Sequence, residues 1–335
     1  MRFELMTTGA PLRRIQDLAR DAASAGFSGL VVTEGARTGY LACAAAALAA
    51  DIDISTGIAV AFPRSPMVTA QSAWELAELS GGRFRLGLGT QVRAHIERRY
   101  AAPFDPPGPR LREYVEAVRA IFRAFRDHER LDFSGSYWSF SLLPAQWSPG
   151  PIDVPDPPID VAAVSPWMLR MAGEVADGVH VHPLNTPTYL AQTVLPCVGE
   201  NVELAVPVFT AVGDTTEEQQ RWWEMARMQV AFYGSTPNYA FIFDQIGFEG
   251  TTARIRERQK AGDLAGMAAV IDDDLLQHFV VRGSWEELPT LIVDRLGDVA
   301  TRAIAYFAGM AWLQDPGFQE RWGNVARAIT ASSGA

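Results

Sequence analysis

Two histidines share one face of a short apolar segment and are the first residues to consider for chemistry. His180 and His182 flank Val181, and side chains alternate across a strand, so both imidazoles point to the same side. A pair of imidazoles could begin a metal site. The acidic residues and the other histidines give no compatible cluster at neighbouring strand ends. We therefore expect no metal, with His182 lining a substrate pocket and His180 packed in the interior.

The most distinctive short string is SGGRFRLGLGT, which runs from Ser80 to Thr90. Its first two glycines are typical of a helix end, and Phe84–Leu88 has the composition of a buried strand. Gly87 and Gly89 at the end of this strand leave room for a flat ligand to approach the main chain. Glycines in such a place more often mark a bend or a bulge than a ligand site, so the string alone decides little.

Eight short β-rich runs alternate with amphipathic helical patterns along the chain. Several of these runs are almost continuously apolar, which is typical of strands buried on both faces of a parallel sheet. Ser65-Pro66 and Ser165-Pro166 each place a capping oxygen before a proline and predict helix starts. Eight such units without a dinucleotide-binding fingerprint predict an α/β fold of the closed (β/α)8 TIM-barrel type. The expected strands are Phe3–Thr7, Gly29–Thr33, Ile54–Val60, Phe84–Leu88, Ile159–Val164, Gly178–Val181, Leu204–Ala211 and Arg302–Phe307.

Three stretches are longer than a minimal barrel needs. We expect a single domain over 1–335, with insertions at about 91–110, 127–158 and 232–278. Residues 131–140 have the pattern of a hairpin, and the third insertion has a helical pattern. Long segments that follow barrel strands lie at the catalytic mouth, where they form lids or substrate walls.

Composition excludes several classes of partner. The 335 residues carry a net charge of -10, which disfavours nucleic acids and anionic membranes. The first twenty residues include several charged side chains and no apolar signal core. Cys43 and Cys197 are too few for a disulfide framework. These features predict a cytoplasmic protein that acts on a small molecule.

Three segments together carry a resemblance to a known family. They are STGIAVAFPRSP at Ser55–Pro66, SGGRFRLGLG from Ser80, and SPWMLRMAGEVADG at Ser165–Gly178. They resemble the luciferase-like monooxygenase superfamily, and the strand spacing extends the likeness over nearly the whole chain. Gly89–Tyr100 is most similar to the actinobacterial branch that depends on coenzyme F420, a deazaflavin hydride carrier. The resemblance also implies pairing into a homodimer.

The resemblance implies a place for the cofactor. In this family a bulge in the third strand, with a cis peptide bond not involving proline, backs the central ring, and Gly57 and Ile58 match it here. Gly89 and Thr90, after the fourth strand, are expected beside the same ring.

A phosphate of the cofactor is implied at the helix start at Ser165, where the N–H groups of Trp167 and Met168 are available. A plain helix cap explains this turn equally well.

The chain departs from the family at the acid/base positions. Glu34 matches an acidic residue of the family, but Gly35 replaces the catalytic histidine that follows it in the sugar-phosphate dehydrogenase members. Val92 stands near the place of a second acidic residue. We therefore take His95 and Glu34 as the candidates that hold or move a proton.

The function that follows is hydride transfer between coenzyme F420 and a small organic substrate. His182 and Trp138 are expected to line the substrate pocket. One alternative is an FMN-dependent monooxygenase on the same ring site. A second alternative is a cofactor-free barrel that binds a ligand, and a third is a barrel hydrolase, for which the chain offers few nucleophile or metal-ligand candidates.

Overall fold

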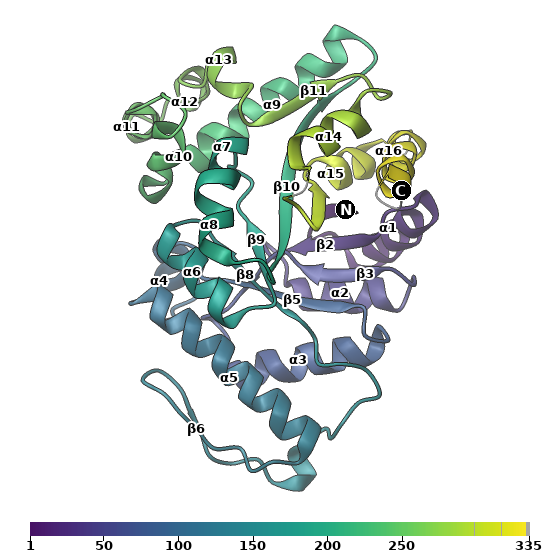
Figure 1. Ribbon diagram of the computed structural model, residues 1–335, viewed down its shortest axis with the longest axis vertical. Coiled ribbons are helices and arrows are strands. Elements are labelled where there is room, and N and C mark those ends of the chain that lie inside the picture. The colour runs from purple at the N-terminus through teal and green to yellow at the C-terminus, as the bar shows by residue number, and fades with distance from the viewer. Residues whose placement is uncertain (298, 316, 333–335) are drawn as a thin grey trace.

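The chain forms a closed barrel of eight parallel strands surrounded by helices, as predicted (Figure 1). The computed structural model describes residues 1–332 except 298 and 316. The barrel closes because β9 pairs with β10, β10 with β12, and β12 with β1. In order around the barrel, the strands are β1 (Arg2–Thr8), β2 (Gly29–Thr33), β3 (Asp53–Thr56) with β4 (Ala59–Val60), β5 (Phe84–Gly89), β8 (Ile159–Ala163), β9 (Gly178–Val181), β10 (Glu203–Val212) and β12 (Arg302–Ala305).

Helices cover the outside of the barrel and extend beyond its mouth. The helices between barrel strands and at the C-terminal end are α1 (Leu12–Ala25), α2 (Gly39–Ala47), α3 (Pro66–Leu79), α4 (Arg93–Arg98), α5 (Pro107–Asp127), α6 (Pro166–Val175), α7 (Pro187–Tyr189), η2 (Leu190–Val194), α8 (Leu195–Val198), α9 (Thr216–Gly234), α14 (Leu288–Leu296), α15 (Ala308–Gln314) and α16 (Phe318–Ser332). None of the helices in the described part of the chain combines the length and the apolar character that a bilayer span requires.

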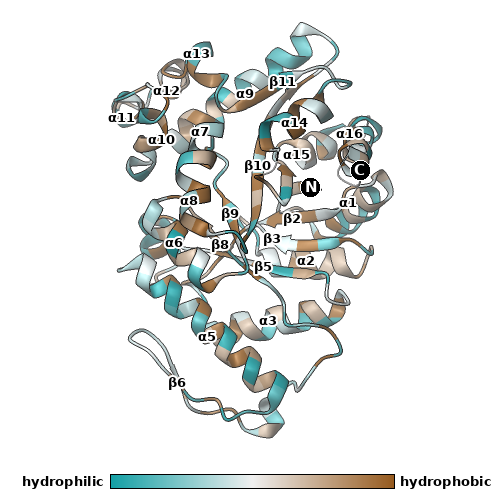
Figure 2. Cartoon of the chain, in the orientation of Figure 1, coloured by the Kyte–Doolittle hydropathy of each residue, from teal (hydrophilic) through white to brown (hydrophobic). Residues whose placement is uncertain are grey.

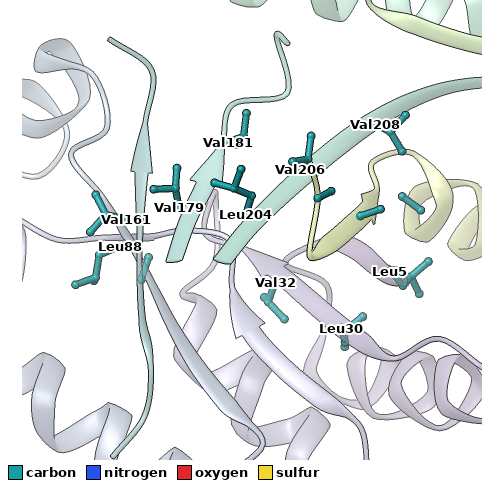
Figure 3. Packing of buried hydrophobic residues seen from close by; sticks show 14 of the residues in the cluster. Leu5, Leu30, Val32, Leu88, Val161, Val179, Val181, Leu204, Val206 and Val208 are labelled. Atoms are coloured by element: carbon teal, nitrogen blue, oxygen red, sulfur yellow. The ribbon is translucent and has the colours of Figure 1, made fainter. Parts of the chain in front are cut away.

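The outward faces of the strands form the main hydrophobic core. Leu5, Leu30 and Val32 alternate with inward-facing residues and pack between the barrel and its helices, as do the other labelled side chains of Figure 3. Brown, apolar residues are concentrated in the strands in Figure 2, whereas α5 carries both teal and brown residues. Burial of this face stabilises the barrel by roughly 25 cal/mol per Å² of apolar surface.

The inward faces at the N-terminal ends of the strands carry an ionic network rather than apolar side chains. Arg302 pairs with Asp160 and is 2% exposed. Arg85 bridges Asp160 at 2.8 Å and Glu203 at 2.5 Å, and Glu4 lies 3.6 Å from Arg302. Charged side chains that pair across the barrel close this end, so the opposite end is left for ligands.

The segments outside the minimal barrel form a hairpin and a group of short helices. Residues 127–158 contain the predicted hairpin, β6 (Phe133–Ser134) with β7 (Ser139–Phe140), followed by η1 (Ala145–Trp147). Residues 232–278 are helical: η3 (Pro237–Tyr239), α10 (Ala240–Asp244), α11 (Thr251–Lys260), α12 (Leu264–Ala269) and α13 (Asp273–Leu276). The sequence reading missed β11 (Val280–Gly283), which pairs with the outer half of β10.

Candidate functional site

The bulge between β3 and β4 is held against the end of β2. The peptide bond between Gly57 and Ile58 is cis, at the positions that the resemblance indicates. The N–H of Gly57 donates to the carbonyl of Val32 at 2.9 Å, and the hydroxyl of Thr33 donates to the carbonyl of Gly57 at 2.8 Å. The side chain of Ile58 is half-buried, whereas its neighbours along the strand are buried. Ile58 is therefore the apolar side chain that the bulge presents at the mouth.

The glycines of the third and fourth strands lie against neighbouring side chains. A Cβ on Gly57 would lie 2.2 Å from Cγ1 of Val31 and 2.9 Å from Cε1 of His180. A Cβ on Gly89 would lie 2.8 Å from Cδ1 of Ile58. Neighbouring side chains occupy the positions that a Cβ would take, so packing requires glycine at both places, and the approach of a flat ligand to the main chain stays a prediction. A ring at this place would rest on the side chain of Ile58, with the half-buried Thr90 beside it.

Glu34 lies at the end of β2 with both carboxylate oxygens engaged. Oε1 accepts from Nη2 of Arg64, and Oε2 accepts from Nη1 of Arg64 at 3.0 Å and from the N–H of Val60 at 2.7 Å. Arg64 also donates to the carbonyl of Val60 at 3.1 Å. Glu34 and Arg64 thus fix β4, which directly follows the bulge. This arrangement favours a positioning role for Glu34 over the proton transfer that the sequence suggested.

Removing the carboxylate of Glu34 should cost stability. Glu34→Ala leaves Arg64 without its acid and the N–H of Val60 without its acceptor, and we expect a loss of about 3 kcal/mol in the free energy of unfolding. Glu34→Gln keeps an acceptor and should lose less. Denaturant unfolding measures both, with Asp17→Ala as the control, because the exposed Asp17–Arg20 pair contributes about 0.5 kcal/mol or less. Equal losses for Glu34→Ala and Asp17→Ala would contradict the positioning role.

His95 lies on α4, the short helix after β5. Its side chain is exposed, as are most of its neighbours on this helix except Ile96. His95 and Glu34 are therefore not equivalent candidates for proton transfer: the imidazole is open to solvent, and the carboxylate is enclosed by Arg64.

The start of α6 is a helix N-terminus capped by a serine side chain. The hydroxyl of Ser165 caps the helix by accepting from the N–H of Met168 at 3.4 Å, which leaves the N–H of Trp167 in the first turn. The ring of Trp167 is 46% exposed and lies so close to Gly108 that a Cβ there would be 2.2 Å from Cζ3. The starts of α6 and α5 are therefore in contact.

Arg110, which the sequence reading did not single out, lies in the first turn of α5. Its guanidinium carbon is 4.7 Å from the ring centre of Tyr137, 5.1 Å from that of Trp138 and 5.9 Å from that of Phe62. Nε is buried without a hydrogen bond, and within the described residues no acidic side chain pairs with Arg110. The guanidinium fork matches the geometry of phosphate and carboxylate, so Arg110 has donors available for an anionic ligand.

Trp138 lies on the hairpin, and its ring is in contact with the guanidinium of Arg110. Glu113 of α5 accepts hydrogen bonds from the N–H groups of Ser136, Tyr137 and Trp138, at 2.6 to 2.7 Å, and so ties the hairpin to α5. The ring of Trp138 meets Tyr114 edge to face at 5.2 Å. The structure therefore brings Trp138 to Arg110 and α5.

His182 lies just after the end of β9, among aromatic side chains. Its ring centre is 4.6 Å from those of Tyr233 and Tyr239, and the hydroxyls of Tyr233 and Tyr306 are 2.5 Å apart. Burial, together with His180, lowers the pKa of His182 to about 3. Burial also lowers the pKa of His180 to about 4. The described residues contain no group of three metal-ligating side chains around this pair.

The fold and the site together define a barrel with an apolar bulge near its mouth and an arginine that, among the described residues, has no acidic partner. The sequence profile of the luciferase-like monooxygenase family matches residues 2–303, and the chain belongs to this family. An uncharacterized protein of Mycobacterium tuberculosis is 34% identical over 307 residues, covering 88% of this chain and 90% of that protein. The 5,10-methylenetetrahydromethanopterin reductase of Archaeoglobus fulgidus is 24% identical over 265 residues, covering 76% of this chain and 75% of the reductase.

Solved structures with the same fold include enzymes that use either cofactor. The coenzyme F420-dependent tetrahydromethanopterin reductase from Methanopyrus kandleri has a TM-score of 0.76 and 19% identity, covering 96% of this chain and 97% of its own. A type II Baeyer–Villiger monooxygenase of Pseudomonas putida, solved with FMN, has a TM-score of 0.64 and 17% identity, covering 98% of this chain and 96% of its own.

Proposed function

We propose that this chain is a coenzyme F420-dependent oxidoreductase that acts on a small organic substrate. The observation that carries the proposal is Arg110, which has no acidic partner among the described residues and contacts aromatic rings near the mouth. It fits a cofactor that carries a phosphate next to a flat ring. The reductase of Archaeoglobus fulgidus and the F420-dependent enzyme from Methanopyrus kandleri support the choice of deazaflavin.

One group of residues would contact the ring of such a cofactor, and a second group would contact its phosphate. Ile58 would support one face of the ring, with Gly57 and Gly89 behind it and Thr90 at its edge. Arg110 and the N–H of Trp167, with the turn of Ser165 and Met168, would hold the phosphate. The bound deazaflavin supplies the carbon that accepts or releases a hydride.

The remaining residues of the site act on the substrate and on water. The aromatic side chains around His182 exclude water from the space above the bulge, and exclusion of water strengthens every polar interaction there. His95, exposed on α4, is the group placed to exchange a proton with solvent. Glu34 acts indirectly, by holding Arg64 and β4 in place.

Cofactor titration tests this proposal. Purified protein is titrated with oxidised F420 and, in parallel, with FMN, and binding is followed by the change in cofactor fluorescence. We expect F420 to bind more tightly than FMN. Tighter binding of FMN would support the flavin monooxygenase instead, and binding of neither would support a cofactor-free barrel and overturn the proposal.

A further inference from the structure

The imidazole of His182 is fixed in one tautomer by the loop that follows β9. Its Nδ1 accepts a hydrogen bond from the N–H of Leu184 at 3.0 Å, so Nδ1 carries no hydrogen in the neutral ring. The hydrogen is therefore on Nε2. No side chain or main-chain group in the described part of the structure accepts a hydrogen bond from Nε2. His182 thus offers a donor whose acceptor must come from outside the protein.

The loop that fixes His182 is held to β10 by the buried side chain of Asn185. The side-chain amide of Asn185 donates to the carbonyls of His182 and Pro207, at 3.0 and 2.9 Å, and Asn185 is 2% exposed. These bonds join the end of β9 to β10. The direction of Nε2 is therefore set by the fold before any ligand arrives.

His182 lies one layer above the bulge. His180, two residues earlier on the same face, contacts the position where a Cβ of Gly57 would be. Two residues of a strand advance by about 6.6 Å, so His182 lies higher in the barrel than the Gly57 layer, toward the mouth. A ring resting on Ile58 would have His182 on its open side.

The surroundings of His182 select for an uncharged partner. Tyr233 and Tyr239 pack their rings against it, and the hydroxyl of Tyr233 is already paired with that of Tyr306. The imidazole is neutral, because burial lowers its pKa to about 3. Among the described residues the ring contacts of His182 are with tyrosines and not with a cation. An enclosed carboxylate would therefore lose water without a compensating charge at the ring, whereas a neutral oxygen needs only the one donor.

We propose that His182 selects the substrate, through a hydrogen bond from Nε2 to the oxygen of a flat, uncharged carbonyl compound held among Tyr233, Tyr239 and Tyr306. The substrate class is thus a small aromatic or alicyclic ketone or aldehyde. This rests on the proposed function in one respect: the carbonyl is the group that exchanges hydride with the cofactor.

A matched pair of probes tests the role of His182. Acetophenone and α-methylstyrene have nearly the same shape, but only the ketone has an oxygen acceptor. Binding of each to the F420-loaded protein is measured by calorimetry with oxidised cofactor, so that no turnover occurs. We expect the wild type to bind the ketone about tenfold more tightly than the hydrocarbon, the ratio typical of one hydrogen bond.

Two variants of His182 test whether its Nε2 causes the preference for the ketone over the hydrocarbon. His182→Phe should bind both probes equally, and His182→Gln, which can accept from Leu184 and still donate, should restore part of the preference. His278→Phe is the matched control, because His278 contacts Phe248 on the helical insertion, and it should behave as the wild type. No preference in the wild type, or the same preference in His182→Phe, overturns the proposal.

Cofactor binding is measured separately for every variant. If F420 does not bind to the wild type, the proposed function fails, and the same probe pair on the cofactor-free protein still decides whether Nε2 selects a carbonyl oxygen. If F420 binds and the probes show no preference, only the assignment of His182 fails.

Discussion

Gly57→Ala is expected to destabilise the protein by about 3 kcal/mol and to abolish cofactor binding. The new Cβ would lie 2.2 Å from Cγ1 of Val31 and 2.9 Å from Cε1 of His180, and both neighbours are buried. Packed interiors accommodate added atoms only by moving side chains out of their preferred rotamers or by shifting the backbone. Either movement displaces Ile58, the next residue. Thermal unfolding measures the first effect, and titration with F420 measures the second.

Gly35→Ala is the matched control for this variant. Gly35 also follows a barrel strand near the mouth, but a Cβ there would meet no atom within 4 Å. Its stability should stay within about 0.5 kcal/mol of the wild type. If Gly57→Ala were as stable as Gly35→Ala and bound F420 normally, the bulge could not be packed as described.

Arg110→Met is expected to weaken F420 binding about 30-fold while leaving the fold intact. The methionine keeps an unbranched apolar stem beside Tyr137 and Trp138 but removes the charge, and hydrogen bonds to a charged group contribute about 1.5–3 kcal/mol. The ring fragment of F420 that lacks the phosphate should bind equally to the variant and to the wild type. Fluorescence titration with both ligands measures the two affinities.

Arg112→Met serves as the control for charge on the same helix. Arg112 pairs with Glu116 and Glu174 on the outer surface, so its loss should leave F420 binding unchanged. An equal loss for the two variants would show that net charge, and not the position of Arg110, governs affinity. Equal weakening for the phosphate-free fragment would place Arg110 at the ring instead.

The barrel could be predicted from the sequence because its signal is local. Each strand is a short apolar run, and Ser65 and Ser165 cap their helices as their proline neighbours indicate. The alternation of outward-facing and inward-facing residues along each strand is also visible in the sequence. Which inward-facing residues contact one another across the barrel depends on how the barrel closes. The pairing of Arg302 with Asp160 joins residues 142 positions apart.

The candidate site was predicted less completely, for a related reason. The bulge at Gly57 and Ile58 followed from family likeness, but the contacts of Val31 and Ile58 that require glycine at these positions depend on the folded chain. Glu34 looked reactive because its partner, Arg64, is thirty residues away. Arg110 gave no signal at all, since its distinguishing property is the lack of an acid nearby, and only a folded chain reveals that.

The paired charges of Arg302, Asp160 and Arg85 have a consequence for the order of events. These ion pairs close the barrel at the N-terminal ends of its strands, so ligands must enter and leave through the mouth at the other end. A cofactor that rests on Ile58 lies deeper in the barrel than a substrate that contacts His182. The cofactor must therefore bind first and leave last. Steady-state kinetics in which the concentrations of both ligands are varied would then follow an ordered mechanism.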